Sequence, residues 1–190
     1  IYSFRQDSSF LYYFGVNQPN VIGVIDVDSG EDYMFGNDVD IDDIIWMGPQ
    51  PTVKELAKEV GVDNPGSPGD MAAAIKNAVA KGRKIHFLPP YRAENKLTLE
   101  GLLGISASRV KEYASVELIK AVVKQREIKS PDEIKEIEKA LDISEEMYTA
   151  VMQMAMPGVF EREICGKIEG ICGQYGAHPS FPIILSIHGE

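Results

Sequence analysis

Three histidines are the side chains of this chain best suited to bind a metal or to move a proton. His178 and His188 flank one β-rich segment, and Glu190 is the only carboxylate near them. A hydrolytic metal site needs three or more converging nitrogen or oxygen ligands, so these residues do not form one. His86 lies inside an apolar segment, for which a structural role is the better interpretation. The residues themselves therefore assign no catalytic residue and no metal ligand.

Aspartates are frequent between Asp26 and Asp43, and carboxylates are the usual ligands of calcium. The spacing does not fit a calcium loop, because no Asp-x-Asp-x-Asp-Gly series ends in a glutamate at its twelfth position. A solvated hairpin followed by a loop is the better interpretation.

The two cysteines, Cys165 and Cys172, are seven residues apart in a segment with helical periodicity. Their Cα atoms would lie about 10 Å apart in a helix, which is too far for a disulfide. We interpret them as helix-packing thiols of a reducing cytoplasm, with a reactive site as the alternative. Gly166, Gly170 and Gly173 fall in the same segment, and we expect them to allow close backbone packing.

The formal net charge is -10, from 19 Lys and Arg residues against 29 Asp and Glu residues. Arg5 is the only base among residues 1–50, which carry nine acids. Such a surface argues against nucleic acid or a membrane surface as the partner. No stretch has the roughly 18 uninterrupted apolar residues that span a membrane. The start at Ile1 and the abrupt end at Glu190 lead us to expect a fragment that lacks its own N-terminus.

The periodicity up to residue 124 predicts a layered α/β domain. The strongest signals are a hairpin over 20–36 and a helix from Pro51 to Gly61 with its apolar residues on one face. The other predicted elements are a helix Asp70–Lys81 with Asp70 as N-cap, a strand Lys84–Leu88, a weaker helix from Leu97 to about Ala114, and a segment Val116–Val123 that fits a strand or a helix.

The second part of the chain opens with the clearest helix signal. Ser130, Pro131 and Glu133 are typical of a capping serine, a proline at the first helical position and the partner of a capping box. A further helix over about 159–175 and a final strand Phe181–Ile187 are predicted after it. The stretch 124–130 is the expected domain boundary.

Two blocks near the start resemble a known family. Residues 4–15 (FRQDSSFLYYFG) resemble a segment of the N-terminal domain of bacterial Xaa-Pro aminopeptidases. Ile25-Asp26 and residues 43–48 (DIIWMG) are similar to the second block of that domain. The resemblance implies that residues 1–124 form a creatinase/prolidase-type N-terminal domain with a mixed sheet, incomplete at its start.

Three later blocks are similar to the catalytic pita-bread domain of the same family, in the family order. They are residues 125–134 (QREIKSPDEI), 157–163 (PGVFERE) and 179–184 (PSFPII). Residues 130–190 would then be the first helices and strand of a truncated α+β metallopeptidase domain.

The resemblance implies an aminopeptidase that removes the N-terminal residue from peptides with proline in second position. Members use two divalent metal ions, usually manganese, and form dimers and tetramers. Their ligands and catalytic histidines would lie beyond Glu190, so we expect this chain alone to bind no metal and to be inactive. The expected partners are a peptide substrate and further copies of the chain, in the cytoplasm.

Two positions of the family's substrate cleft can be carried over. Phe181 stands where the family has an aromatic residue of the Pro-Ser-aromatic motif, and Trp46 stands in the Ile-Trp-x-Gly motif, whose indole can reach a neighbouring subunit's active site. Core packing of Phe181 in its strand and an ordinary packed indole for Trp46 are the alternatives.

Two other functions remain open. A prolidase or creatinase shares the two-domain plan, although the Arg-Gln-Asp-Ser block favours aminopeptidase P. Relatives of this fold that have lost the metals act as peptide- or histone-binding modules.

Overall fold

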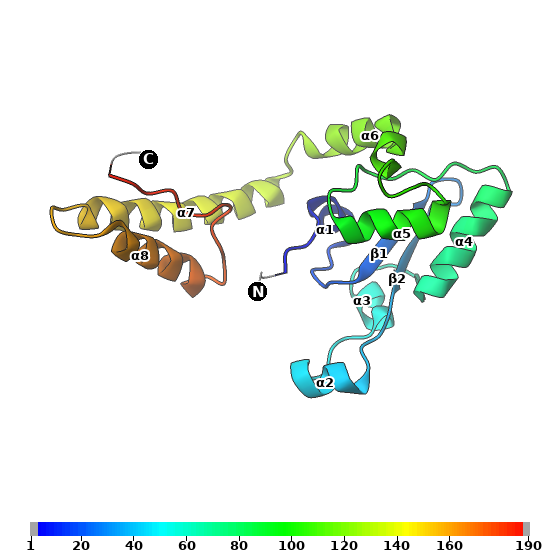
Figure 1. Cartoon of the computed structure of the whole chain (residues 1–190), viewed down its shortest axis with the longest axis horizontal. Helices are drawn as coiled ribbons and strands as arrows, with labels where there is room; N and C mark the ends of the chain where they lie inside the picture. The colour runs from blue at the N-terminus through cyan, green and yellow to red at the C-terminus, as the bar shows by residue number, and fades with distance from the viewer. Residues whose placement is uncertain (1–3, 188–190) are drawn as a thin grey trace. The chain divides into compact units, whose positions relative to one another are not determined.

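The computed structural model describes residues 4–187, and the chain divides into two compact units, residues 1–124 and 125–190. Figure 1 labels helices α1 to α8 and strands β1 and β2. Among the described residues, no helix combines the length and the apolar character that a membrane crossing requires.

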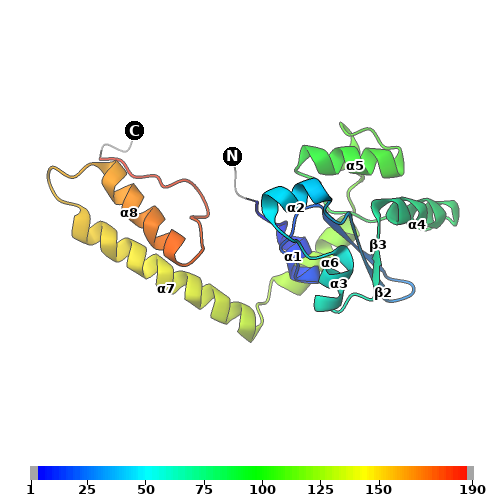
Figure 2. The same ribbon diagram turned by 90° about the horizontal axis from the view of Figure 1, so that it is seen from below.

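The first unit is built on a three-stranded sheet in the order β1-β2-β3, of which Figure 1 labels β1 and β2 and Figure 2 labels β2 and β3. β1 (Val21–Asp26) and β2 (Glu31–Gly36) form an antiparallel hairpin, and β3 (Asn64–Gly66) runs parallel to β2. The hairpin predicted over 20–36 is therefore confirmed, whereas β3 was not predicted. Three residues that include a proline carry too little pattern to indicate a strand.

The core of the first unit lies on one face of this sheet. Side chains alternate along β2, so that Met34, which is 0% exposed, faces α1 (Ser8–Phe14) and α3 (Val53–Glu59). The buried cluster comprises Phe14, Val16, Met34, Val53, Leu56, Ala57 and Val62. α3 begins with a Thr52–Glu55 capping box and ends before Gly61, as its periodicity predicts.

Gly23 of β1 lies directly under the ring of Phe14. A Cβ atom added at Gly23 would lie 2.1 Å from Cε2 and 2.3 Å from Cζ of Phe14. Phe14 is buried and stacks on Phe10 with 5.1 Å between the ring centroids. The helix–sheet contact at this point therefore requires a residue without a side chain.

α4 (Pro68–Ala80) contacts β2 and β3, and Figure 2 shows α3 and α4 on opposite sides of the strands. Its N-cap is Ser67, whose hydroxyl accepts from the backbone N–H of Asp70 at 3.2 Å. The carboxylate of Asp70 accepts from the backbone N–H of Ser67 at 2.8 Å. The predicted N-cap at Asp70 is thus wrong, because Asp70 is the third helical residue of a capping box opened by Ser67.

The strand predicted for Lys84–Leu88 is not formed. A strand needs a partner for its backbone groups, and here the carbonyl of Phe87 accepts from the N–H of Ser115, which precedes a helix. The predicted weak helix of 97–114 is divided into α5 (Ala93–Leu103) and a 3-10 turn, η1 (Val110–Tyr113). The ambiguous segment is helical, as α6 (Val116–Arg126).

An ion pair joins the hairpin turn to the segment that follows α4. Arg83 donates from both terminal nitrogens to the carboxylate of Asp26, at 2.8 Å from Nη1, and also lies 2.9 Å from a carboxylate oxygen of Asp28. The hydrogen bond from Arg83 and the backbone N–H groups of Ser29 and Asp28 hold the pKa of the Asp26 carboxyl well below its usual range.

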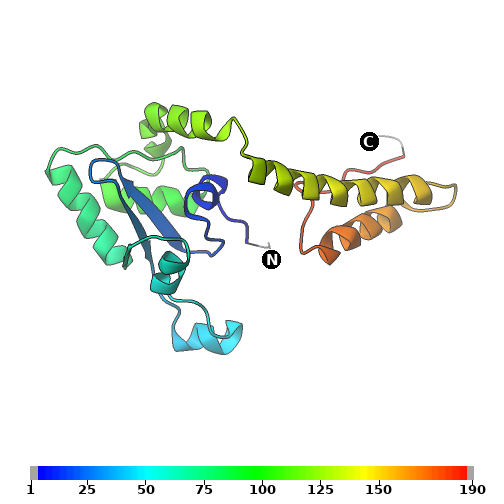
Figure 3. The same ribbon diagram turned by 180° about the vertical axis from the view of Figure 1, so that it is seen from behind.

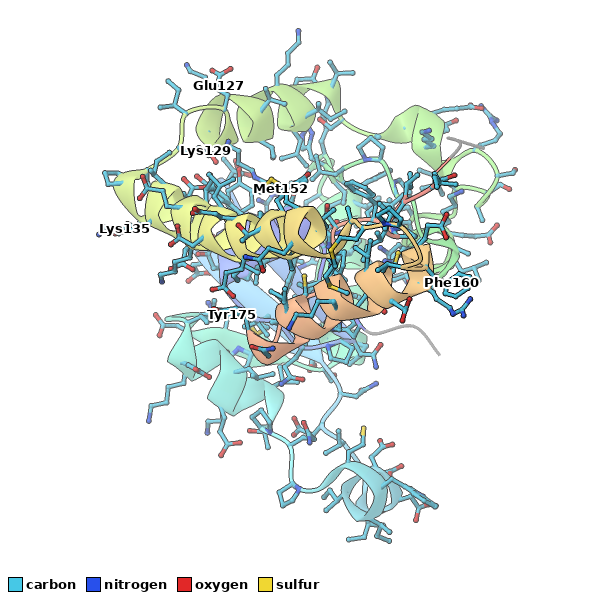
Figure 4. The ribbon with its side chains drawn as sticks, turned by 90° about the vertical axis from the view of Figure 1, so that its left-hand side faces the viewer. Glu127, Lys129, Lys135, Met152, Phe160 and Tyr175 are labelled. Carbon is cyan, nitrogen blue, oxygen red and sulfur yellow. The ribbon has the colours of Figure 1, made fainter. Side chains whose placement is uncertain are left out.

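The second unit is a pair of packed helices, α7 (Pro131–Met154) and α8 (Glu161–Gln174), which run side by side in Figures 1 and 3. Ser130 caps α7 in a reciprocal box with Glu133, which confirms the predicted helix start. The thiol of Cys172 is buried and lies 3.3 Å from the sulfur of Met147. Both cysteines are free thiols, as their spacing predicts. Figure 4 shows Phe160 and Tyr175 at the two ends of α8.

Two expectations for the second unit are wrong. A Cβ atom added at Gly166, Gly170 or Gly173 would meet nothing within 4 Å, so these glycines do not serve close packing within the described chain. Residues 181–187 are irregular, because the described part of this unit contains no other strand with which they could pair.

Candidate functional site

Helix α2 (Ile41–Met47) carries the predicted site residue Trp46. Asp40 caps its start, since one carboxylate oxygen accepts from the backbone N–H of Asp43 at 3.0 Å. Asp42 and Asp43 lie in the first turn, where the helix dipole favours negative charge. Gly48 ends the helix with a positive φ of 76°, and its N–H donates to the carbonyl of Ile44 at 2.8 Å.

The segment that carries α2 extends away from the rest of the first unit, and a hydrogen bond joins its two ends. One carboxylate oxygen of Asp38 accepts from the backbone N–H of Val53, the first residue of α3, at 2.7 Å. Figures 1 and 3 show α2 well apart from the sheet, at the end of two connecting segments. The excursion is therefore closed at its base, while its helix projects from the unit.

Four large apolar side chains of α2 are exposed, and at 100° per residue they point to different sides of the helix. Trp46 is 88% exposed, and Ile41, Ile45 and Met47 are exposed with it; we call these four side chains the α2 apolar surface. The first unit therefore does not pack the indole of Trp46. Asp38 and Asp40 precede α2, Asp42 and Asp43 lie in its first turn, and no base occurs between Arg5 and Lys54. The segment thus offers an aromatic and aliphatic contact area within a negative field.

The second predicted site residue, Phe181, belongs to the other unit. It is 65% exposed and lies in the irregular segment after α8, so it is not a core residue of a strand. Contact of Phe181 or Trp46 with a substrate stays a prediction.

The described residues do not fit a two-metal centre. Among residues 4–187, no group of three or more His, Cys, Asp or Glu side chains converges on a point that could hold a metal ion. His188 and Glu190 lie outside the described residues. We therefore derive no metal-dependent step from this part of the chain.

His86 has a definite polar partner, which the sequence did not indicate. Its Nδ1 lies 2.7 Å from the hydroxyl oxygen of Ser115, and both residues line a cavity of about 330 Å³ with Lys84, Tyr113 and Glu117. A contact across 29 residues leaves no local signal in the sequence.

Comparison with known proteins finds one family model that matches part of the first unit. The model of the family "Aminopeptidase P, N-terminal domain" matches residues 1–86.

Relatives extend the similarity to nearly the whole chain. The Xaa-Pro aminopeptidase of Escherichia coli is 25% identical over 198 residues, which cover 97% of this chain and 44% of that protein. The Xaa-Pro dipeptidase of Homo sapiens is 26% identical over 193 residues, which cover 95% of this chain and 36% of that protein. The chain thus spans less than half the length of these curated relatives.

The fold is that of aminopeptidase P. A zinc-substituted aminopeptidase P of Escherichia coli, solved with its product, superposes with a TM-score of 0.71 at 22% identity, over 92% of this chain and 42% of that one. This likeness includes both the mixed α/β first unit and the helices of the second.

Helix α2 itself was missed by sequence analysis, although its signals were present. Asp40 before Ile41 and Gly48 after Met47 are a good N-cap and a good stop. The seven residues between them are too few to display helical periodicity, which hid the helix.

Proposed function

We propose that this chain forms the N-terminal part of an Xaa-Pro aminopeptidase, an enzyme that removes the residue before a proline from the amino end of a peptide. The observation that supports this most strongly is the fold likeness, which extends over 92% of the chain and thus over both units. Sequence similarity to Xaa-Pro peptidases over the same length points in the same direction. The divalent metals that such activity requires would be held by residues outside 4–187.

Helix α2 gives the first unit a part in substrate recognition. A flat indole that is 88% exposed suits contact with the apolar ring of a substrate proline. The carboxylates around the α2 apolar surface favour the positively charged free amine of a peptide substrate. The same surface suits docking onto a second copy of the chain, which would bring Trp46 to that copy's substrate site.

The compartment proposed for the enzyme is the cytoplasm. Cys165 and Cys172 are both free thiols, which fits a reducing environment.

The proposal is tested with the full reading frame that encodes this chain. The product should release the first residue from Xaa-Pro-Yaa peptides in the presence of manganese. Trp46→Ala should lower kcat/KM by about 5- to 30-fold, the range expected for an aromatic contact residue, and Trp46→Phe should retain most activity. Val27→Ala is the matched control, because Val27 is equally exposed at 86% and lies outside α2.

Absence of turnover on every Xaa-Pro-Yaa peptide would contradict the proposed activity. Equal kcat/KM for Trp46→Ala and Val27→Ala would leave the activity in place and remove the role of α2.

A second candidate is an Xaa-Pro dipeptidase, because the human dipeptidase is as similar to this chain as the aminopeptidase of Escherichia coli is. The same preparation distinguishes the two: a dipeptidase cleaves Xaa-Pro and leaves Xaa-Pro-Yaa intact, and an aminopeptidase gives the opposite result.

The 190-residue chain alone should release no amino acid from a Gly-Pro-Yaa peptide, with or without manganese, because its described residues supply no ligand set for the metals. Metal-dependent release by the purified chain would contradict this.

A further inference from the structure

A three-residue hydrogen-bonded chain crosses between two distant segments of the first unit. His86 Nδ1 lies 2.7 Å from Ser115 Oγ, and Ser115 Oγ lies 3.1 Å from a carboxylate oxygen of Glu117. The backbone N–H of Leu118 also reaches Ser115 Oγ, at 3.2 Å. Ser115 therefore links the start of α6 to the segment 84–88.

The direction of each hydrogen bond follows from the single proton of the Ser115 hydroxyl. The carboxylate of Glu117 can only accept, so this proton goes to Glu117. The backbone N–H of Glu117 and then the Ser115 hydroxyl hold the pKa of the Glu117 carboxyl below its ordinary value, which keeps it charged. Ser115 Oγ must then accept from His86, so Nδ1 of His86 carries a proton.

This link adds to the packing of α6, whose Leu118, Ile119 and Val122 are only half-buried. No residue of α6 is buried, and Val116 and Val123 are more than half exposed. Ser115, in contrast, is buried, and its backbone N–H donates to the carbonyl of Phe87 at 3.0 Å. The polar contacts of Ser115 thus attach the helix to the segment 84–88.

The position of α6 in the chain gives this attachment a consequence. The boundary between the two compact units, at residue 124, falls within the last turns of α6. A docked α6 extends the ordered first unit up to the boundary. A released α6 becomes part of the connection between the units.

We propose that His86, Ser115 and Glu117 form a latch that holds the start of α6 on the segment 84–88 and sets whether this helix is docked or released. The hollow beside the latch is open to solvent. The other titratable groups around this cavity are Lys84 and Tyr113.

The test is hydrogen exchange of the whole 190-residue chain, read at the amides of α6. His86→Ala removes the donor and leaves the serine cap of α6 intact. Exchange in α6 should rise by about two- to tenfold, the range that follows from losing one hydrogen bond. His86→Asn places an amide N–H where Nδ1 was and should restore exchange to within twofold of the original chain. His178→Ala is the matched control, an exposed histidine of the other unit.

Amides of α4 and α7 serve as internal references. A rise in α4 as large as that in α6 would mean general loss of stability and would overturn the latch. Unchanged α6 exchange in His86→Ala, or an equal rise in His178→Ala, would also overturn it. Nitrogen-15 NMR gives a second readout: a proton on Nε2 with Nδ1 bare contradicts the proposed hydrogen-bond direction.

Discussion

The contact between Gly23 and Phe14 makes the sharpest stability prediction. Gly23→Ala would place a methyl group 2.1 Å from an aromatic carbon of Phe14, where ordinary contacts begin at 3.4 Å. The ring would have to move by about 1.3 Å to restore an ordinary distance. Phe14 is buried and stacked on Phe10, so the neighbouring core must move with it.

Overpacking of this kind costs about 1–3 kcal/mol. The lower conformational entropy of alanine in the unfolded chain offsets about 0.4–1 kcal/mol of this cost. We therefore expect Gly23→Ala to destabilise the first unit by about 1–2 kcal/mol and to lower its melting midpoint by several degrees.

The control is Gly101→Ala in the interior of α5. A Cβ atom added there meets nothing within 4 Å, and the backbone is helical. The same substitution should therefore stabilise the unit by up to about 1 kcal/mol, because alanine favours a helix over glycine. Urea unfolding followed by circular dichroism measures both variants, and hydrogen exchange in β1 reports on the first unit alone.

A double-mutant cycle with Phe14→Leu isolates the contact itself. If the clash causes the loss, the smaller side chain should relieve part of it, with a coupling of about 0.5–3 kcal/mol between the two sites. Strict additivity, or a Gly23→Ala variant as stable as the original chain, would refute the reasoning.

Three further predictions concern charge, cleavage and association. Because hydrogen bonds with Arg83 lower the pKa of Asp26 in the folded state, its stabilising effect is present above its unfolded pKa of about 3.9 and is lost as the pH falls further. When the stability of each protein is expressed relative to its own value at neutral pH, acid unfolding monitored by circular dichroism should therefore begin at lower pH in Asp26→Asn than in the original chain. An unchanged profile counts against this. Trypsin should cut first at residues 126–130, where Glu127 and Lys129 stand on the exposed turn in Figure 4, and earlier cuts within 20–36 would contradict the prediction. The exposed apolar face of α7 should cause self-association at micromolar concentration, which Leu141→Glu should reduce; a monodisperse 21.0 kDa species in light scattering would exclude it.

Two elements with strong local signals, α7 and the hairpin, were predicted correctly. The capping box at Ser130 fixes the start of α7 within four residues, and the turn of the hairpin is specified by Asp26 and the glycine at position 30. In both cases the groups that satisfy the backbone are close in sequence. The start of α4 was misplaced because Asp70 is a favourable residue both for an N-cap and for the third helical position.

Elements whose partners are distant were not predicted correctly. The segments 84–88 and 181–187 have strand composition, but a strand exists only where another strand accepts its hydrogen bonds. Composition likewise says nothing about whether an indole is packed, and the exposure of Trp46 follows from the projection of α2 rather than from its sequence motif. The bond between His86 and Ser115 joins residues 29 positions apart and could only be seen in the folded chain.

The closure of the α2 excursion by Asp38 and Val53 has a consequence for how such proteins can diversify. Residues 39–52 contribute no residue to the buried cluster, and their two ends are already held together by one hydrogen bond. The entropy cost of changing the length of such a loop is small, about 0.6 kcal/mol for each doubling. The length and sequence of residues 39–52 can therefore change at little cost to the core that carries them.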